Sequence, residues 1–98
     1  MNKALIITKL KKIKPILKDK FKIEKIALFG SYARDTNNEK SDIDLLIELQ
    51  ENNKLNYFEL ENLRNLLEKE LDNKIDIVDK KYLNPIIGFY AQKDMIYV

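Results

Sequence analysis

The sequence predicts an α/β protein of the α+β type, in which a small mixed β-sheet carries helices packed on one of its faces. Two stretches repeat apolar residues at helical spacing, one over residues 6–17 and one over residues 60–71. Three shorter stretches are apolar or alternate between apolar and polar residues, as strands do, over residues 23–29, 43–49 and 74–78. No repeat, low-complexity segment or linker divides the 98 residues, so we expect a single domain over residues 1–98.

The first expected element is an amphipathic helix from about Lys3 to Lys18, and Pro15 should kink it or end it early. A strand from Ile23 to Phe29 follows. Gly30 and Ser31 then open a short helix whose first amides have no partner within the helix and could face a bound phosphate. A polar loop leads to the second strand.

In the second strand, period-two alternation separates an inward face from an open face. The inward face should be core and carries Ile43, Leu45, Ile47 and Leu49. The other face should line a cleft near the start of the strand and carries Asp42, Asp44, Leu46 and Glu48.

The elements of the second half are marked by capping residues. Asn56 and Glu59 form a capping-box pattern at the start of a helix that should end near Asp72. A third strand should follow over residues 74–78. Pro85, at the first position after an Asn84 cap, starts a helix that should reach about Gln92, and residues 95–98 fit a terminal edge strand.

Two carboxylates on one strand face give the strongest chemical signal. Asp42 and Asp44 are two residues apart, so they point the same way with Cα atoms roughly 6.6 Å apart. Such acids repel each other unless a cation neutralises them, and a hard ion such as Mg²⁺ prefers oxygen ligands shared with substrate phosphates. A solvated strand face is the plainer explanation, but the phosphate-compatible Gly30-Ser31 turn just before this strand favours a nucleotide-metal site.

These residues resemble the motif of the minimal nucleotidyltransferase family, in the DNA polymerase beta-like nucleotidyltransferase superfamily. The family pattern is an apolar strand, G-S-x-A-R-G, a loop, and S-D-x-D followed by an aliphatic residue. This chain has Leu28-Phe29-Gly30-Ser31-Tyr32-Ala33-Arg34 and Ser41-Asp42-Ile43-Asp44-Leu45, and it departs from the pattern only at Asp35, where the family usually has glycine. The resemblance extends over nearly the whole chain and implies the polymerase beta-like nucleotidyltransferase fold.

The resemblance also implies which residues form the site. Asp42 and Asp44 would bind two Mg²⁺ ions, for which Mn²⁺ could substitute, and Asp76 in the third strand would be the third carboxylate ligand. All three would be catalytic. Gly30 and Ser31 would bind the phosphates of ATP. The nucleotide-binding set is completed by Arg34, which could equally pair with a nearby carboxylate and fix the loop. Asp72 and Asp79 are less favoured third acids, because both lie at expected element ends.

The resemblance also implies a reaction and a partner. Members are commonly paired with HEPN-domain proteins as toxin–antitoxin modules, in which the transferase moves AMP from ATP to a tyrosine hydroxyl of the HEPN toxin and silences it. Two alternatives remain open on the sequence: a small-molecule acceptor such as an aminoglycoside, bound with a partner subunit, and a non-catalytic antitoxin that masks its partner. The retained acids argue against a pure binder.

Composition limits the chemistry and the location. The chain has no cysteine and no histidine, so disulfides, thiolate zinc sites and histidine bases are excluded. No stretch approaches the roughly 20 apolar residues of a membrane span, and no signal-peptide pattern is present, so we expect a cytoplasmic protein with no membrane contact. Residues 1–25 carry a net charge of +7 and the remainder −5. This basic segment fits the wet face of a helix better than a nucleic-acid site, because no aromatic residues for base stacking are interleaved with the lysines.

Overall fold

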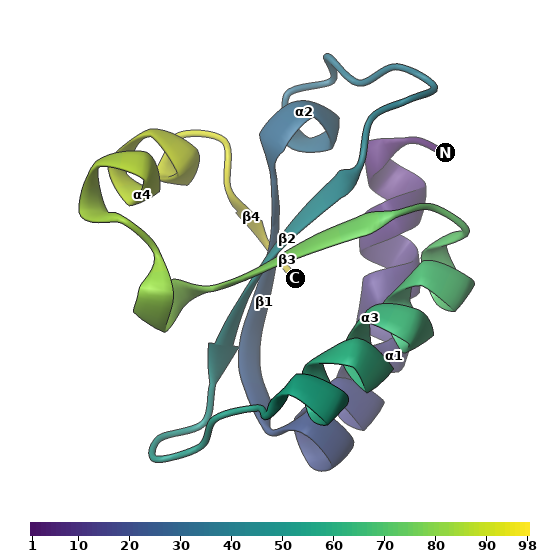
Figure 1. The fold of residues 1–98 in the computed structure, drawn as a ribbon. Coiled ribbons are helices and arrows are strands. Elements are labelled where there is room, and N and C mark those ends of the chain that lie inside the picture. Colours follow the sequence, from purple (N-terminus) through teal and green to yellow (C-terminus); the bar gives the residue numbers. More distant parts are fainter.

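The sheet has four strands in the order β3-β2-β1-β4 in the computed structural model, which describes residues 1–98 (Figure 1). β1 (Ile23–Phe29) and β2 (Ile43–Leu49) form an antiparallel pair at its centre. β3 (Ile75–Asp79) runs parallel to β2, and the two-residue β4 (Ile96–Tyr97) pairs antiparallel with β1. The predicted mixed sheet and its terminal edge strand are thus confirmed. The end of β1 and the beginnings of β2 and β3 meet at one end of the sheet.

Two long helices cover one face of this sheet. α1 (Lys3–Phe21) and α3 (Tyr57–Leu71) lie side by side there (Figure 1). Their apolar stripes meet the inward strand residues in one cluster of 17 buried side chains, to which Leu10, Leu63 and Leu45 contribute fully buried side chains. The helical and strand periodicities of the sequence therefore converge on a single core.

Helix α1 does not stop at its proline. It continues through Pro15 to Phe21, three residues beyond the expected end at Lys18. Pro15 is exposed, so it lies on the solvent side of the helix, while Leu17 and Phe21 beyond it are buried in the core. Burial of these two side chains outweighs the lost backbone hydrogen bond, and Lys22 ends the helix in the left-handed region.

Helix α3 has the ends that its sequence predicts. The Asn56 side chain accepts from the Glu59 N–H at 2.8 Å, and the Glu59 carboxylate accepts from the Asn56 N–H at 3.0 Å. The helix ends at Leu71, and its C-cap residue Asp72 has a φ of 49°. The capping box is confirmed.

Two charged side chains of α3 hold the outer edge of β3. The Ile75 carbonyl accepts from Arg64 Nη1 at 2.8 Å, and the Ile75 N–H donates to Glu68 Oε2 at 3.3 Å. These bonds occupy both backbone groups of an edge residue that has no further strand beside it. They also fix the backbone next to Asp76.

The opposite face of the sheet is partly covered, contrary to one expectation. Leu46 should face an open cleft, but only 2% of it is exposed. The chain leaves β3 through a 3₁₀ turn (Lys80–Tyr82) into α4 (Pro85–Gln92), which Asn84 caps as predicted. Leu46 lines a cavity of about 330 Å³ together with residues of α4 and the β4 segment. The sequence did not predict this partial covering, because the alternation of apolar and polar residues in a strand does not show which later segment of the chain packs over its open face.

None of the helices is both long enough and apolar enough to cross a membrane.

Candidate active site

The site forms at the end of the sheet where β1 stops and β2 and β3 start. β1 leads directly into the four-residue helix α2 (Gly30–Ala33), whose first turn has no side-chain cap. Phe29, the last residue of β1, is the cross-strand partner of Asp44. The turn and the second aspartate are therefore adjacent because of the register between the two central strands.

Glycine is required at position 30 both by the backbone φ angle there and by the neighbouring Asp44 side chain. Its φ is +75°, in the left-handed region that favours glycine. A Cβ built on Gly30 would overlap the Asp44 carboxylate and lie 2.9 Å from its Cγ. The motif glycine therefore makes room for the motif aspartate, in addition to any role at a phosphate.

The three predicted acids share one face of the sheet. Asp44 and Asp76 are direct partners in the parallel register of β2 and β3, so their side chains project from neighbouring positions. Asp42 precedes β2 by one residue and follows the same alternation. No three acidic side chains converge closely enough here to form a ready-made metal cage. The three carboxylates border an open surface instead.

The charge on this face is uncompensated. Burial raises the pKa of Asp44 above its ordinary value, and the negative charges of Asp76 and Asp42 raise it further. The positive charge of Arg34 acts in the opposite direction but does not cancel these effects. A divalent cation would relieve the repulsion, and an all-oxygen donor set suits Mg²⁺, which normally completes its shell with water and substrate phosphates. The residues present therefore fit such an ion.

Arg34 and Asp35 are tied to segments outside the loop. Arg34 Nη1 lies 3.5 Å from Asp94 Oδ2, in the turn after α4, with about half of the Arg34 side chain exposed. Asp35 has a φ of 60°, so the left-handed turn is made without the family glycine. Its carboxylate accepts from Lys3 Nζ at 3.0 Å, and Lys3 also donates to the Ala33 carbonyl. Sequence reasoning considered a carboxylate partner for Arg34 but could not identify it.

A buried tyrosine joins the phosphate turn to the third strand. Tyr32 is 3% exposed, and its hydroxyl accepts from Asn73 Nδ2 at 2.9 Å. Asn73 lies two residues before β3, which carries Asp76. Tyr32 belongs to the core cluster, so its ring contributes to packing.

A cavity of about 460 Å³ opens beside the turn. One wall is formed by Phe29, Gly30 and Arg34, and the other by α4. The α4 side chains that line it include Ile86, Ile87 and Tyr90. Sequence analysis missed this wall, although an uncharged apolar octapeptide, Pro85-Ile-Ile-Gly-Phe-Tyr-Ala-Gln92, was a visible signal.

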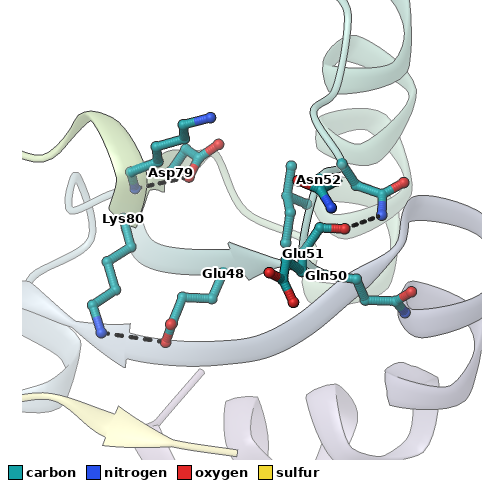
Figure 2. Close-up of a pocket in the computed structure, with 9 residues that line it drawn as sticks. Glu48, Gln50, Glu51, Asn52, Asp79 and Lys80 are labelled. Atoms are coloured by element: carbon teal, nitrogen blue, oxygen red, sulfur yellow. Dashed lines mark hydrogen bonds and ion pairs between the residues drawn. The ribbon is translucent and has the colours of Figure 1, made fainter.

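Another cavity, which is polar and has a volume of about 410 Å³, lies at the other end of β2 and β3 (Figure 2). Glu48 Oε2 is 3.5 Å from Lys80 Nζ there and makes no hydrogen bond.

Asp79 lines this cavity, and its carboxylate accepts from the Lys81 N–H at 3.0 Å. Its register partner is Ile47, three positions along β2 from Asp44. Asp72 caps α3 and is exposed. Neither rival acid lies beside Asp44 in the sheet.

Comparison with known sequences places the chain in a family. Residues 10–98 match the model described as nucleotidyltransferase domain. A relative named protein adenylyltransferase, from Methanocaldococcus jannaschii, is 48% identical over 90 residues, covering 91% of this chain and 90% of that protein. A protein adenylyltransferase from Thermococcus cleftensis, named MntA, is 34% identical over 83 residues, covering 84% of this chain and 81% of that protein.

Solved structures share the fold. A minimal nucleotidyltransferase superposes with a TM-score of 0.80 at 25% identity, covering 98% of this chain and 95% of that one. A toxin–antitoxin crystal structure with AMP-PNP gives 0.69 at 26% identity and covers 99% and 72%. The complex of a tri-AMPylated HEPN toxin from Shewanella oneidensis with its MNT antitoxin gives 0.67 at 24% identity and covers 94% and 70%. The match over residues 10–98, together with these relatives, shows that the chain belongs to the nucleotidyltransferase domain family.

Proposed function

We propose that this chain transfers AMP from ATP to a tyrosine hydroxyl of a partner HEPN toxin, with Mg²⁺ as cofactor, and so acts as an antitoxin in the cytoplasm. The observation that carries the proposal is the alignment of Asp44 with Asp76 on an open face, directly against Gly30 of the phosphate turn. The AMP-PNP in a related toxin–antitoxin structure supports ATP as the nucleotide. In the Shewanella complex the toxin itself is AMPylated, which supports a protein acceptor.

The chain's own residues divide the work between binding and proton transfer. Gly30 lets the backbone approach the triphosphate, and the amide and hydroxyl of Ser31 donate hydrogen bonds to it. Arg34, which lines the same cavity as Gly30, adds positive charge. Asp42, Asp44 and Asp76 would ligate two Mg²⁺ ions, or Mn²⁺ in their place, and when bound these would neutralise the charge that develops on the phosphates.

The reaction is an in-line displacement at the α-phosphorus. The acceptor oxygen forms a bond to that phosphorus while the bond to the oxygen bridging the α- and β-phosphates breaks. Pyrophosphate leaves with the bridging oxygen and its electron pair. The acceptor hydroxyl loses its proton to Asp76 or to water beside it, because Asp76 is an exposed carboxylate on the reacting face.

The test separates transfer from masking. The wild-type chain and the double variant Asp42→Asn, Asp44→Asn are each incubated with the HEPN protein, ATP and Mg²⁺. Intact-mass spectrometry of the HEPN protein should show added AMP units with the wild type only. The double variant should still fold, because both side chains lie on the open face, and calorimetry should show that it still binds the partner.

The toxic activity of the repurified HEPN protein gives the second result. We expect it to stay low after wild-type treatment and to be unchanged after treatment with the double variant. Neutralisation by both proteins only before the HEPN protein is repurified, without any change in its mass, would leave masking as the function and would rule out the transferase proposal for this partner. Mass added to an aminoglycoside instead would establish the small-molecule acceptor.

A further inference from the structure

Helix α4 exposes an apolar surface that no part of this chain covers. Its eight residues include no charged side chain and none that is buried. The exposed fractions are 70% for Ile86, 58% for Ile87, 62% for Phe89 and 62% for Tyr90. Because an apolar helix stripe is normally turned into a core, and exposed apolar patches of this kind mark interaction sites, α4 requires an occupant.

The shape of this surface points to a protein rather than a small ligand. Successive helix residues advance by 100°, so these four side chains span an arc of about 160° around α4. Gly88 lies on the other side of the helix, toward Leu83. One flat nucleobase can contact part of such an arc but cannot cover it. A surface of this width fits the side of another folded protein.

The position of the surface ties its occupant to the reaction. Ile86, Ile87 and Tyr90 line the cavity that Gly30 and Arg34 also line. A protein seated on α4 would therefore stand at the edge of this cavity, beside the turn proposed to bind the phosphates, close to which an acceptor hydroxyl must arrive.

The charge around α4 specifies the chemistry of the occupant. Lys93 Nζ lies 5.4 Å above the rings of both Phe89 and Tyr90, and it forms no ion pair within the chain. Lys81, before the helix, forms none either. The acid nearest along the chain, Asp94, is engaged by Arg34. A complementary surface would be apolar at its centre and carry carboxylates at its rim.

From these observations we propose that α4 is the docking surface for the acceptor protein of the transfer reaction, and that the acceptor presents an apolar face with an acidic rim. This inference rests on the proposed function, since it assumes a protein acceptor. A second copy of the chain is the competing occupant, because Tyr57 and Phe58 are also exposed and have Glu59 beside them. That contact would join two different surfaces, and such contacts build rings or open fibres rather than closed dimers.

The chain offers a matched pair of variants for the test. Phe89→Ser, Tyr90→Ser removes an exposed edge-to-face aromatic pair with centroids 5.5 Å apart, and Tyr57→Ser, Phe58→Ser removes a similar pair, 5.9 Å apart, far from the cavity. A third variant, Phe89→Ser alone, spares the cavity beside Gly30 and Arg34, which Phe89 does not line. Each is compared with the wild type for association with the HEPN protein, ATP affinity, AMP transfer and molar mass in solution.

Both α4 variants should bind the HEPN protein at least about tenfold more weakly, with a matching rise in KM for this acceptor. ATP affinity of Phe89→Ser and every property of the Tyr57, Phe58 variant should match the wild type. Unchanged association and transfer in the α4 variants would overturn the docking surface while leaving the transferase function intact. A loss confined to ATP affinity would assign α4 to the nucleotide, and a fall in molar mass would assign it to a second copy. If the wild type neither binds nor modifies the HEPN protein, both the function and the docking inference fail for this acceptor.

Discussion

At the scale of single residues, the site depends on one glycine and one aspartate that occupy the same space. The open conformation of Gly30 admits the carboxylate of Asp44, and this half-buried carboxylate faces Asp76 across the strand register. Spacing in the sequence predicted that Asp44 shares a strand face with Asp42, and Gly30 was expected in a turn that could approach phosphates. It could not predict that Gly30 also accommodates Asp44, because that contact arises from the β1–β2 register rather than from either motif.

The raised pKa of Asp44 makes stability depend on pH in a defined direction. The folded protein holds this proton more tightly than the unfolded chain, so ionisation of Asp44 destabilises the fold as pH rises from about 3.8 through the raised folded value. Without metal at pH 7, Asp44→Asn should therefore raise Tm by up to a few degrees. Near pH 3 this gain should disappear, because wild-type Asp44 is then protonated in both states.

Thermal unfolding with a chelator, at pH 3 and pH 7, checks this result. Added Mg²⁺ should raise the Tm of the wild type and have less effect on the variant. A Tm gain that is equal at both pH values would show that ionisation of Asp44 is not its cause.

The role of the third acid can be tested by comparing two aspartates. Asp76→Asn should lower the rate of AMP transfer at least about 100-fold, since it removes the carboxylate beside the attacking hydroxyl. ATP affinity should fall only modestly, because Asp42 and Asp44 remain. Asp72→Asn, at an exposed helix end, should leave both properties unchanged. Transfer assays and calorimetric titration with ATP and Mg²⁺ measure the two effects, and an active Asp76→Asn enzyme would remove Asp76 from the catalytic set.

At the scale of elements, local sequence determined most of the boundaries. Capping residues at Asn56 and Asn84 placed the starts of α3 and α4, and alternation placed β2. The prediction for α1 was wrong at its end, because the packing of Phe21 outweighs the local effect of Pro15. Interactions between distant elements lie outside such reasoning, as the link between α2 and the segment before β3 shows.

The hydrogen bond from Asn73 to the Tyr32 hydroxyl gives a prediction for Tyr32→Phe. Removing the hydroxyl leaves the partly buried Asn73 amide without its acceptor, which should cost about 1 kcal/mol and lower Tm by about 4–8 °C. Because Tyr32 lies inside α2, the ATP affinity should also fall. Tyr82→Phe, at a site 72% exposed, is the control and should change neither property. If Tyr32→Phe bound ATP like the wild type, the bond would serve stability alone.

At the scale of the whole molecule, the two faces of the sheet differ in how they are covered. The face under α1 and α3 is a closed core, whereas the face toward α4 has Leu46 beside a cavity and leaves the acids open. The sequence predicted the closed face from two helical stripes. It did not predict the partial cover, because α4 buries none of its own residues, and an apolar helix in the sequence does not show whether that helix packs closely on the sheet.

Alanine substitutions of two neighbouring leucines, one on each face of the sheet, measure this difference in packing. Leu45→Ala should lower the free energy of unfolding by about 3 kcal/mol, as for a fully buried core leucine. Leu46→Ala should cost at least about 1 kcal/mol less, because an existing cavity already borders it and α4 can settle inward. Urea denaturation of both variants measures the two losses. Equal losses would mean that α4 packs as firmly as the two long helices.

The order of the strands along the chain also determines where this protein can be divided into two fragments. The phosphate turn and two of the acids lie in one continuous stretch, residues 29–44, whereas Asp76 arrives only after the exposed loop of residues 51–54 at the opposite end of β2. Two fragments divided in that loop would each carry an incomplete set of the proposed catalytic acids, and the break would lie at the opposite end of β2 from Asp44. Because β2 and β3 pair only when the fragments meet, this division would turn the fold into a reporter of proximity between whatever two proteins the halves are fused to.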